Sequence, residues 1–371
     1  MSFRIMCAAA VLTLVAAPLA HAQSGETTSL KNRDGKSKVD YAKPLPLPTS
    51  PTAAAPLLDL LRQAEKSPIV EEAHAEDGQA GDGVRSLVKL PKSKVKAAAD
   101  GAPPAPEFGT SGMVYNTAYE PNPERDPSRR AGKLFFKDNG DQFVCSASMV
   151  RRGVLVTAAH CVSQFGENRF FSNFKYVPAY SDGAAPFGEW DWHTVIAPTK
   201  YLKGTDRCAV RGIVCESDVA VIILAPQGSR YAGDATGYFG FAVGGFSYNN
   251  AGQAQITQLG YPVSLNGGEE MIRTDAQGVI DQSLANNTVM GSGQTGGSSG
   301  GPWLVNFGLG VTPDNTNPFG RDPQRNRVVG VTSWGYNDNG QMKQQGASFF
   351  TKKNITTLVK DACKKVKAAC K

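Results

Sequence analysis

A glycine-rich run in the last quarter of the chain places the strongest constraint on what this sequence can fold into. Residues Gly293–Trp303 read GQTGGSSGGPW, and five of these 11 residues are glycine. Glycine lets a backbone turn sharply or approach a ligand closely, so a serine among glycines can present its hydroxyl and its amide outward. Ser299 is such a serine. A hydroxyl is a weak nucleophile without an adjacent base, so the run alone also fits a flexible loop.

Two motifs upstream of the glycine-rich run carry groups that could activate a hydroxyl. The first, LVTAAHCV, is an apolar strand-like run that ends at His160, and the second, ESDVAVII, places Asp218 before a β-branched run typical of a buried strand. Chain order is therefore His160, Asp218, Ser299. The sequence around Ser299 also fits the GxSxG elbow of α/β-hydrolases, but that fold needs its histidine after the serine, and none of the four histidines follows Ser299.

Through TAAHC, DVAV and GGSSGGP in this order, the chain resembles the trypsin/chymotrypsin-like serine peptidases, in their bacterial trypsin-like or glutamyl-endopeptidase-like branch. The resemblance covers roughly Lys133 to the C-terminus. It implies a secreted serine endopeptidase that acts on proteins or peptides through an acyl-enzyme, with no cofactor and no metal. The alternative from another class is a catalytically silent peptidase fold that serves as a binding or adhesion module.

The resemblance also implies a role for each residue of the site. Ser299 would be the nucleophile, His160 its base and Asp218 the group that orients the imidazole, while the backbone N–H groups of Gly297 and Ser299 would form the oxyanion hole. Because a free imidazole titrates near 6.5, we expect activity to rise from pH about 6 to 8.

The expected specificity pocket is polar and neutral. Gly293 stands where trypsin has its specificity aspartate, and Ser298 stands where trypsin-like zymogens have the aspartate that pairs with the freed N-terminal amine. The run from Thr332 to Gly335 resembles the substrate-pairing strand of the family, whose serine commonly bonds the catalytic aspartate. We expect substrate contacts from Gly293, Gln294, Thr332, Ser333, Trp334, Gly335 and Ser348.

Residues 1–22 have the pattern of a secretory signal peptide. Arg4 gives a positive start, Cys7 to Ala20 is apolar but too short to span a bilayer, and Ala20-His21-Ala22 fits a cleavage site. No other apolar stretch approaches membrane length. We therefore expect an extracellular or periplasmic protein with no membrane partner.

Residues 23–110 have a different composition from the rest of the chain. Pro, Ala, Ser, Lys and Asp dominate, aromatic residues are nearly absent, and Lys43–Pro56, KPLPLPTSPTAAAP, favours extended polyproline II. This predicts a largely disordered pro-region or linker, with one short helix at Pro56–Lys66. Because many secreted peptidases are made with pro-segments, the resemblance favours a segment removed on activation and a partner role for it.

Residues 111–371 are expected to form one all-β peptidase domain. Short Val/Ile/Phe/Tyr runs alternate with Gly, Asn, Asp and Pro, which indicates a sandwich or barrel. The resemblance selects two packed six-stranded antiparallel β-barrels, at about 125–235 and 236–352, with a C-terminal α-helix at 354–368. The predicted strands include Lys133–Phe136, Phe143–Val150, Gly153–Thr157, Val219–Leu224, Ile256–Tyr261 and Val328–Ser333.

Six cysteines remain once Cys7 is set aside with the signal peptide, and an even number in an exported chain indicates a disulfide framework. Cys208 and Cys215 flank AVRGIV, which predicts a small local loop. Cys363 and Cys370 would stand about 10 Å apart along a continuous helix, so either the helix ends before Cys370 or the pairing differs. The resemblance implies a Cys145–Cys161 bridge beside the histidine.

Charge and cysteine spacing argue against two other classes of function. The formal net charge of +6 comes from 39 basic and 33 acidic residues spread along the chain, without the basic stripe that nucleic-acid binding requires. No CxxC spacing of the kind found in zinc sites occurs.

Overall fold

The structure is a computed structural model that describes residues 25–41, 45–46, 52–53, 73–86, 88–91, 107–108, 115–281, 285–308, 322, 324–338 and 341–371. The predicted signal peptide and the predicted helix at Pro56–Lys66 lie outside these residues. Within them, no helix has the length and apolar character needed to cross a membrane.

The first barrel closes because one long strand pairs on both edges. Strand β13 pairs with β11 and also with β16, which completes the circle β13-β11-β8-β9-β10-β16. An Asn139-Gly140 turn with positive φ at both residues joins β8 to β9, as a two-residue hairpin requires. The six strands are β8 (Ala131–Asp138), β9 (Asp141–Arg151), β10 (Val154–Thr157), β11 (Ser172–Pro178), β13 (Trp190–Pro198) and β16 (Ala220–Leu224).

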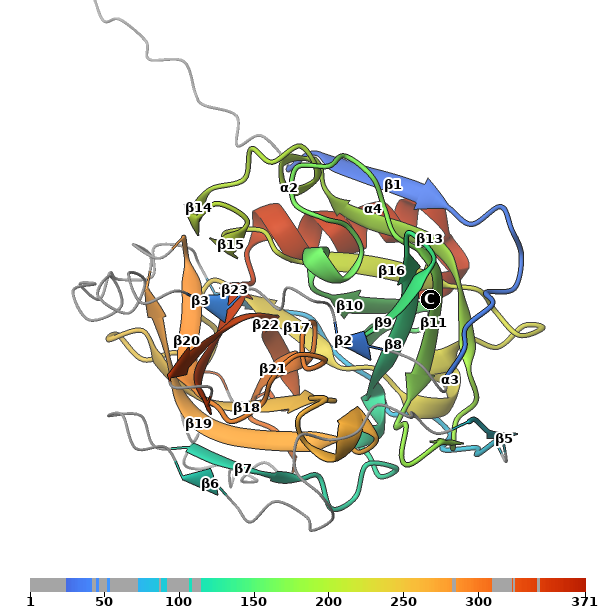
Figure 1. The fold of residues 1–371 in the computed structure, drawn as a ribbon, viewed down its shortest axis with the longest axis horizontal. Coiled ribbons are helices and arrows are strands. Elements are labelled where there is room, and N and C mark those ends of the chain that lie inside the picture. Colours follow the sequence, from blue (N-terminus) through green and yellow to red (C-terminus); the bar gives the residue numbers. More distant parts are fainter. Residues whose placement is uncertain are drawn as a thin grey trace, which may run out of the picture.

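The second barrel has the same construction and lies beside the first (Figure 1). It closes through the pairing of β18 with β19, in the order β18-β21-β22-β23-β20-β19. Its strands are β18 (Gln253–Gly260), β19 (Ile272–Asp281), β20 (Asn287–Gly291), β21 (Pro302–Val305), β22 (Arg327–Asp338) and β23 (Gln341–Phe349).

The predicted two-barrel, all-β architecture is confirmed, and each predicted strand overlaps an observed one. The β-branched runs predicted as buried strands are buried: every residue of β10 and β16 is buried. Ile256, Ile280 and Trp303 belong to the core of the second barrel.

Short helices complete the two-barrel domain. They are η1 (Ser128–Arg130), η2 (Ala159–Cys161), α2 (Thr199–Leu202), α3 (Ala232–Thr236) and η3 (Asn266–Gly268). A further hairpin, β14 (Cys208–Val210) with β15 (Ile213–Cys215), carries the predicted local loop. Its Cys208–Cys215 disulfide is confirmed.

The C-terminal helix is interrupted where the sequence predicted one continuous helix to residue 368. A π-helical turn, η4 (Lys352–Thr356), leads into α4 (Thr357–Lys365), and η5 (Lys367–Cys370) follows. Between them Val366 has φ −137° and ψ 85°, outside the helical region. The break brings the Cα atoms of Cys363 and Cys370 to 5.5 Å, so a disulfide joins them.

Parts of residues 23–110 lie on the barrels as short strands, which their composition did not predict. Strand β1 (Thr27–Lys31) pairs with β13 and lies near α4 (Figure 1). The other strands of this region are β2 (Leu45–Pro46) on β9, β3 (Thr52–Ala53) on β22, β4 (His74–Ala75) on β17 (Gly240–Val243), β5 (Val88–Lys89) on β12 (Ala184–Ala185), and β6 (Glu107–Phe108) on β7 (Tyr115–Tyr119), which itself pairs with β19.

Candidate active site

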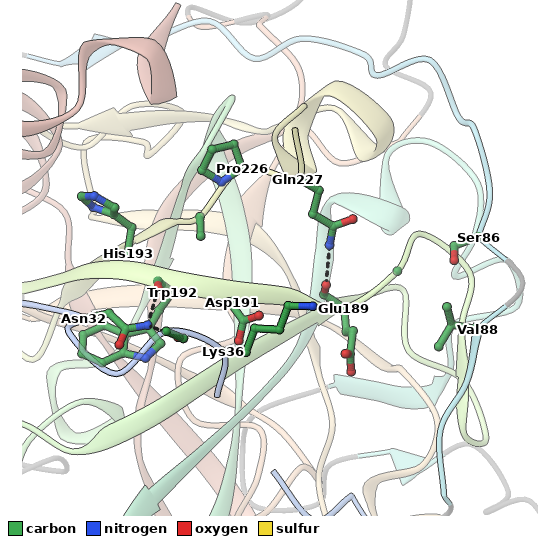
Figure 2. A pocket seen from close by; sticks show the side chains of 13 residues that line it. Asn32, Lys36, Ser86, Val88, Glu189, Asp191, Trp192, His193, Pro226 and Gln227 are labelled. Atoms are coloured by element: carbon green, nitrogen blue, oxygen red, sulfur yellow. Dashed lines mark hydrogen bonds between the residues drawn. The ribbon is translucent and has the colours of Figure 1, made fainter. Parts of the chain in front are cut away.

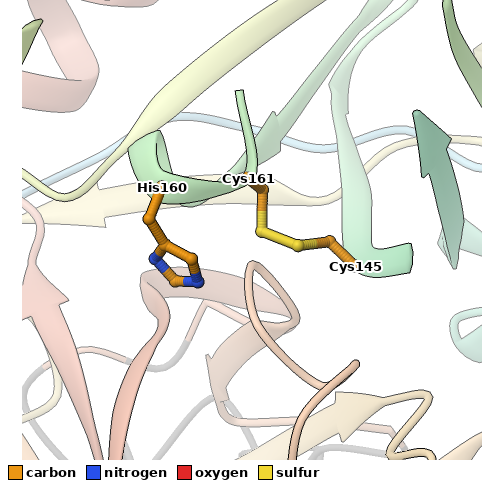
Figure 3. Close-up of side chains that lie close together, drawn as sticks. All are labelled: Cys145, His160 and Cys161. Atoms are coloured by element: carbon orange, nitrogen blue, oxygen red, sulfur yellow. A yellow bond between two sulfur atoms is a disulfide. The ribbon is translucent and has the colours of Figure 1, made fainter. Parts of the chain in front are cut away.

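His160 lies just after a buried strand, and a disulfide at the neighbouring residue holds it in place. Strand β10 ends at Thr157, and the histidine follows on the single turn η2. Its neighbour Cys161 is bonded to Cys145 of β9, which confirms the predicted bridge, and Figure 3 shows the imidazole projecting next to that bridge. The position of the ring is therefore set by the first barrel.

Asp218 holds His160 at two points. One carboxylate oxygen, Oδ1, accepts the backbone N–H of His160 at 2.8 Å, and the other, Oδ2, lies 2.7 Å from Nδ1. Both residues are buried, with 2 % of Asp218 and 7 % of His160 exposed. An ionised carboxylate can only accept, so Nδ1 carries the proton and Nε2 of the neutral ring is an acceptor.

Residues of the second barrel form hydrogen bonds with Asp218. Ser333 of β22 donates its hydroxyl to Asp218 Oδ2 at 2.5 Å, which is the contact expected of the serine in this strand. The backbone N–H of Asp218 donates to Ser348 Oγ at 3.2 Å, and that hydroxyl donates to the carbonyl of Cys215 at 2.8 Å. Asp218 thus belongs to the first barrel but is held by β22 and β23.

The loop that carries Ser299 is tied to strands of both barrels. Ser146 of β9 donates its backbone N–H to Ser299 O at 2.7 Å and its hydroxyl to Gly297 O at 2.8 Å. On the other side, the N–H of Gly300 donates to Thr332 O of β22 at 2.8 Å. These bonds fix Ser299 at the junction of the barrels.

Gly297 and Gly300 need to be glycine for two reasons. Their φ values are +96° and +79°, and a Cβ would lie 2.4 Å from the carbonyl oxygen of Tyr261 at Gly297 and 2.0 Å from Thr157 Oγ1 at Gly300. The close approach of Gly300 to Thr157 also brings the Ser299 loop against the segment that leads into His160.

Of the two adjacent serines, Ser298 has its hydroxyl held in two hydrogen bonds. Ser298 Oγ donates to Thr295 O at 2.6 Å and accepts from Gln345 Nε2 at 3.1 Å. Within the described part of the chain, Ser299 Oγ and His160 Nε2 form no hydrogen bond, either with each other or with another group. The amides of Gly297 and Ser299 likewise donate to no group there.

The side chains of two residues expected to contact substrate point into the second barrel. Gln294 is fully buried, and its Nε2 donates to Thr274 Oγ1 at 3.1 Å. Thr332 Oγ1 accepts from Gln258 Nε2 at 2.8 Å and from Trp303 Nε1 at 2.9 Å. Both polar groups are therefore used inside the protein, and a specificity role for these side chains stays a prediction.

The remaining expected contacts lie around β22, β23 and the start of the serine loop. Trp334 donates to Asn287 Oδ1 at 2.8 Å and packs against Gly346, where a Cβ would lie 2.0 Å from the indole. Gly335 follows on the same strand, and Gly293 donates its N–H to Thr117 Oγ1 at 3.2 Å. Ser333 and Ser348 contact Asp218, and a substrate-binding role for the whole set stays a prediction.

Sequence reasoning missed the polar residues that support the serine loop. Gln258 of β18 donates to Thr332 and to Gln345, and Ser292 donates to Gln258 Oε1 at 2.8 Å. Gln345 in turn binds Ser298. Gln258 and Gln345 sit in strands and Ser292 directly follows β20, all without a motif, so no local signal distinguishes them from exposed polar positions.

One cluster of potential metal ligands coincides with the site. Cys145, His160 and Cys161 offer ligand atoms within 4.8 Å of one another (Figure 3). Both sulfur atoms belong to one disulfide, so neither is the thiolate that a metal would need. The same holds for Cys208 and Cys215 beside Asp206.

A hollow of about 680 Å³ lies elsewhere on the first barrel, between β13 and the N-terminal segment (Figure 2). Asn32 donates to the carbonyl of Trp192 at 3.0 Å, and Gln227 donates to that of Glu189 at 2.7 Å. His193 also lines the hollow, where burial, and then the charge of Lys31, lower its pKa. None of the residues expected at the catalytic site lines it.

Two closed six-stranded barrels are the architecture that the resemblance to the trypsin/chymotrypsin-like serine peptidases implied. No family model and no curated protein matches this chain.

Solved structures that are similar to this chain include the following three. A thermostable serine protease, AL20, from an extremophilic microorganism is 24 % identical with a TM-score of 0.46, over 60 % of this chain and 92 % of that one. Protease Anisep from Arthrobacter nicotinovorans is 24 % identical with a TM-score of 0.47, over 65 % and 95 %. A Glu endopeptidase in complex with MPD is 16 % identical with a TM-score of 0.46, over 69 % and 97 %.

Proposed function

We propose that this protein is a serine endopeptidase in which Ser299, His160 and Asp218 form the catalytic triad. The proposal rests on the two contacts that Asp218 makes with His160. Oδ1 accepts the backbone N–H of His160 at 2.8 Å, and Oδ2 lies 2.7 Å from Nδ1. The second contact fixes the proton on Nδ1, and among the described residues Nε2 has no hydrogen-bond partner, so it is available to accept the Ser299 proton.

In the proposed mechanism, Ser299 Oγ attacks the carbonyl carbon of the substrate and its proton passes to His160 Nε2. Asp218 stabilises the imidazolium that forms. The negative charge on the substrate oxygen is accepted by the N–H groups of Gly297 and Ser299, and each such donor contributes about 3 kcal/mol of transition-state stabilisation. His160 then protonates the leaving amine. In the second half, water attacks the acyl carbon while His160 Nε2 accepts its proton, and His160 returns a proton to Ser299 Oγ as the bond from Oγ to the acyl carbon breaks.

The missing Ser299–His160 hydrogen bond does not conflict with this mechanism. In a site without substrate, such bonds are often long and tighten only when substrate binds. A catalytically silent binding module would also lack this hydrogen bond. An experiment is therefore needed to distinguish the two functions.

We also propose that the protein is exported. Three disulfides are formed among the described residues, and such bonds persist in oxidising compartments such as the periplasm or the extracellular space. The signal-like residues 1–22 support the same proposal. Peptide or protein substrates follow from the proposed chemistry.

Labelling by a fluorophosphonate probe tests the proposed nucleophile. We expect the folded protein to be labelled, and Ser299→Ala to lose the label together with hydrolysis of a diverse peptide library. Ser298→Ala is the matched control, because its hydroxyl is already committed to Thr295 and Gln345, and its folded fraction should keep the label. Absence of labelling and hydrolysis from every folded form of the protein would favour the silent module.

A further inference from the structure

The backbone that leads into Asp218 is tied to the residues on the other side of a small hairpin. Only Glu216 and Ser217 separate Asp218 from the end of β15. The N–H of Glu216 donates to the carbonyl of Arg207 at 2.8 Å, and the N–H of Ser217 donates to Asp206 Oδ2 at 2.7 Å. Both acceptors lie just before β14, so the two ends of the hairpin hold each other.

The Cys208–Cys215 disulfide keeps these two ends together. Cys208 begins β14, Cys215 ends β15, and the two residues lie opposite each other in the strand register. Each strand has only three residues. Because a two-stranded hairpin is marginally stable on its own, the disulfide is what gives this one a fixed geometry at the end nearest Asp218.

A strained residue indicates that the shape of the hairpin is imposed on it. Val214 is fully buried in β15 and has a φ of +54°, which is unfavourable for a β-branched residue. It packs with Trp334 and Val289, since β15 lies against β22 and β23 of the second barrel (Figure 1). Such strain persists only where the surrounding structure determines the conformation, and strained residues gather near functional sites.

Two buried side chains of the second barrel hold the same segment. Ser348 Oγ and Asn287 Nδ2 both donate to the carbonyl of Cys215, at 2.8 and 3.0 Å. Ser348 Oγ also accepts the backbone N–H of Asp218 at 3.2 Å. Neither side chain is exposed to solvent. The hydroxyl hydrogen of Ser348 is therefore committed to Cys215, and its oxygen to Asp218.

Asp206 is the charged member of this arrangement. It is 7 % exposed, and its Oδ1 lies 2.8 Å from Lys200 Nζ, which is also 3.2 Å from Glu216 Oε2. Burial raises the pKa of Asp206, and the hydrogen bond and charge of Lys200 oppose this effect. A carboxylate is costly to bury unless it is paired and hydrogen-bonded, and the bond that Oδ2 makes holds the residue next to Asp218.

We propose that Asp206 and the Cys208–Cys215 disulfide position the carboxylate of Asp218 for catalysis, with Ser348 as their counterpart on the second barrel. This rests on the proposed peptidase function and adds positioning residues to its triad. Asp218 must stay at 2.7 Å from His160 Nδ1 to keep the proton there and to stabilise the imidazolium. A displacement of 1 Å in a catalytic site can cost about 100-fold in rate.

Removal of the disulfide tests the first part of the proposal. We expect the double variant Cys208→Ser with Cys215→Ser to lower kcat on a peptide substrate about tenfold or more. The matched control is Cys363→Ser with Cys370→Ser, because that bridge has the same sequence separation of 7 and its loss frees an equal loop in the unfolded chain. The control should lower Tm to a similar extent and leave kcat within about twofold.

Three single variants test the side chains. Asp206→Ala removes the acceptor for Ser217 and should lower kcat about tenfold with KM within about twofold, whereas Asp206→Asn keeps an acceptor oxygen and should recover most of the loss. Ser348→Ala should also lower kcat. A rise in KM at unchanged kcat would instead assign Ser348 to substrate binding and remove it from the proposal.

The proton on His160 Nδ1 provides a measurement that does not depend on hydrolysis. In the natural protein we expect its NMR resonance far downfield, as for a hydrogen bond to a carboxylate. Asp206→Ala and Ser348→Ala should move this resonance upfield or broaden it. A merely structural role, which leaves the contact between Asp218 and His160 intact, would not change it.

The outcomes separate the positioning role from the peptidase function. If Asp206→Ala and the Cys208/Cys215 double variant lower Tm but keep the kcat and the Nδ1 resonance of the natural protein, the positioning role is wrong and the peptidase stands. If the natural protein shows neither hydrolysis nor fluorophosphonate labelling, the peptidase is wrong. The Nδ1 resonance of Asp206→Ala then still decides whether Asp206 sets the position of Asp218.

Discussion

At the scale of single residues, the candidate site depends on backbone positions that tolerate no side chain. Gly300 has a φ of +79°, and a Cβ there would lie 2.0 Å from Thr157 Oγ1 and 2.4 Å from the carbonyl oxygen of Ser146. Backbone atoms cannot rotate away as a flexible side chain can. The glycine therefore lets the serine loop lie directly against the first barrel.

We predict that Gly300→Ala lowers the free energy of unfolding by about 3 kcal/mol or more, because left-handed backbone strain adds to an overlap that forces the two barrels apart. Peptide hydrolysis should be lost as well. Gly140→Ala is the control: its φ is +94°, but nothing lies within 4 Å of the added Cβ, so we expect a loss of about 1 kcal/mol and full activity. Urea unfolding of the two variants compares them, and equal losses would contradict the packing argument.

At the scale of elements, the junction of β1 with β13 brings a histidine and a lysine together. The N–H of Asn32 donates to the carbonyl of His193 at 2.8 Å, and Lys31 pairs with Thr194 in the strand register. Burial of His193, and then the charge of Lys31, lower the pKa of the imidazole below its ordinary value of about 6.5. Pairing of β1 with β13 thus places the cation of Lys31 where it helps to lower the pKa of this imidazole.

This junction predicts a pH dependence of stability. Below pH about 6.5 the unfolded chain protonates His193 more readily than the folded protein does, so stability should fall as the pH drops from 7.5 through that range toward 5. His193→Gln should reduce this fall in Tm, and Lys31→Gln should reduce it less, because burial is the larger cause. A fall in Tm that is identical in His193→Gln and in the natural protein would contradict the assignment.

At the scale of the whole molecule, a buried ion pair joins the two barrels. Lys133 Nζ of β8 lies 3.0 Å from Glu269 Oε1, beside η3 of the second barrel, and Tyr180 donates its hydroxyl to Glu269 Oε2 at 2.5 Å. Burial lowers the pKa of Lys133, and the carboxylate of Glu269 opposes this effect. The pair is satisfied only while the barrels remain together.

We predict that Lys133→Met destabilises the protein by about 3–5 kcal/mol, because it leaves the Glu269 carboxylate buried without its cation. Adding Glu269→Gln should recover at least about 1 kcal/mol, since the buried charge is then removed too. Denaturant unfolding of the single and double variants measures this coupling. If the free energy of unfolding of Lys133→Met lies within about 1 kcal/mol of that of the natural protein, the ion pair does not hold the barrels together.

Much of the fold could be predicted from the sequence because strands and turns are marked by residues that lie close together in the chain. The buried strands β10 and β16 appear as apolar runs, and Asn139-Gly140 marks a hairpin turn. Cys208 and Cys215 lie seven positions apart, so their pairing could be predicted from local sequence. The candidate triad residues were found through motifs of the same short range.

Other features could not be predicted because they depend on contacts distant in sequence. The break at Val366 follows from the packing and pairing of the C-terminal turn, and helical periodicity alone predicted a longer helix. The supporting residues Gln258, Gln345 and Ser146 acquire their roles only when strands far apart in the chain meet.

By itself, the sequence determined the strands, the turns and the chemical groups available at His160, Asp218 and Ser299. Only the tertiary structure decided that β22 supports Asp218 from the second barrel, that Leu45–Pro46 lies on the edge of β9, and that Thr52–Ala53 lies on the edge of β22. The reason is that strand periodicity is carried by side chains, whereas pairing at an open edge uses backbone groups common to almost every residue. Which segment occupies such an edge is therefore set by where the folded barrels place it.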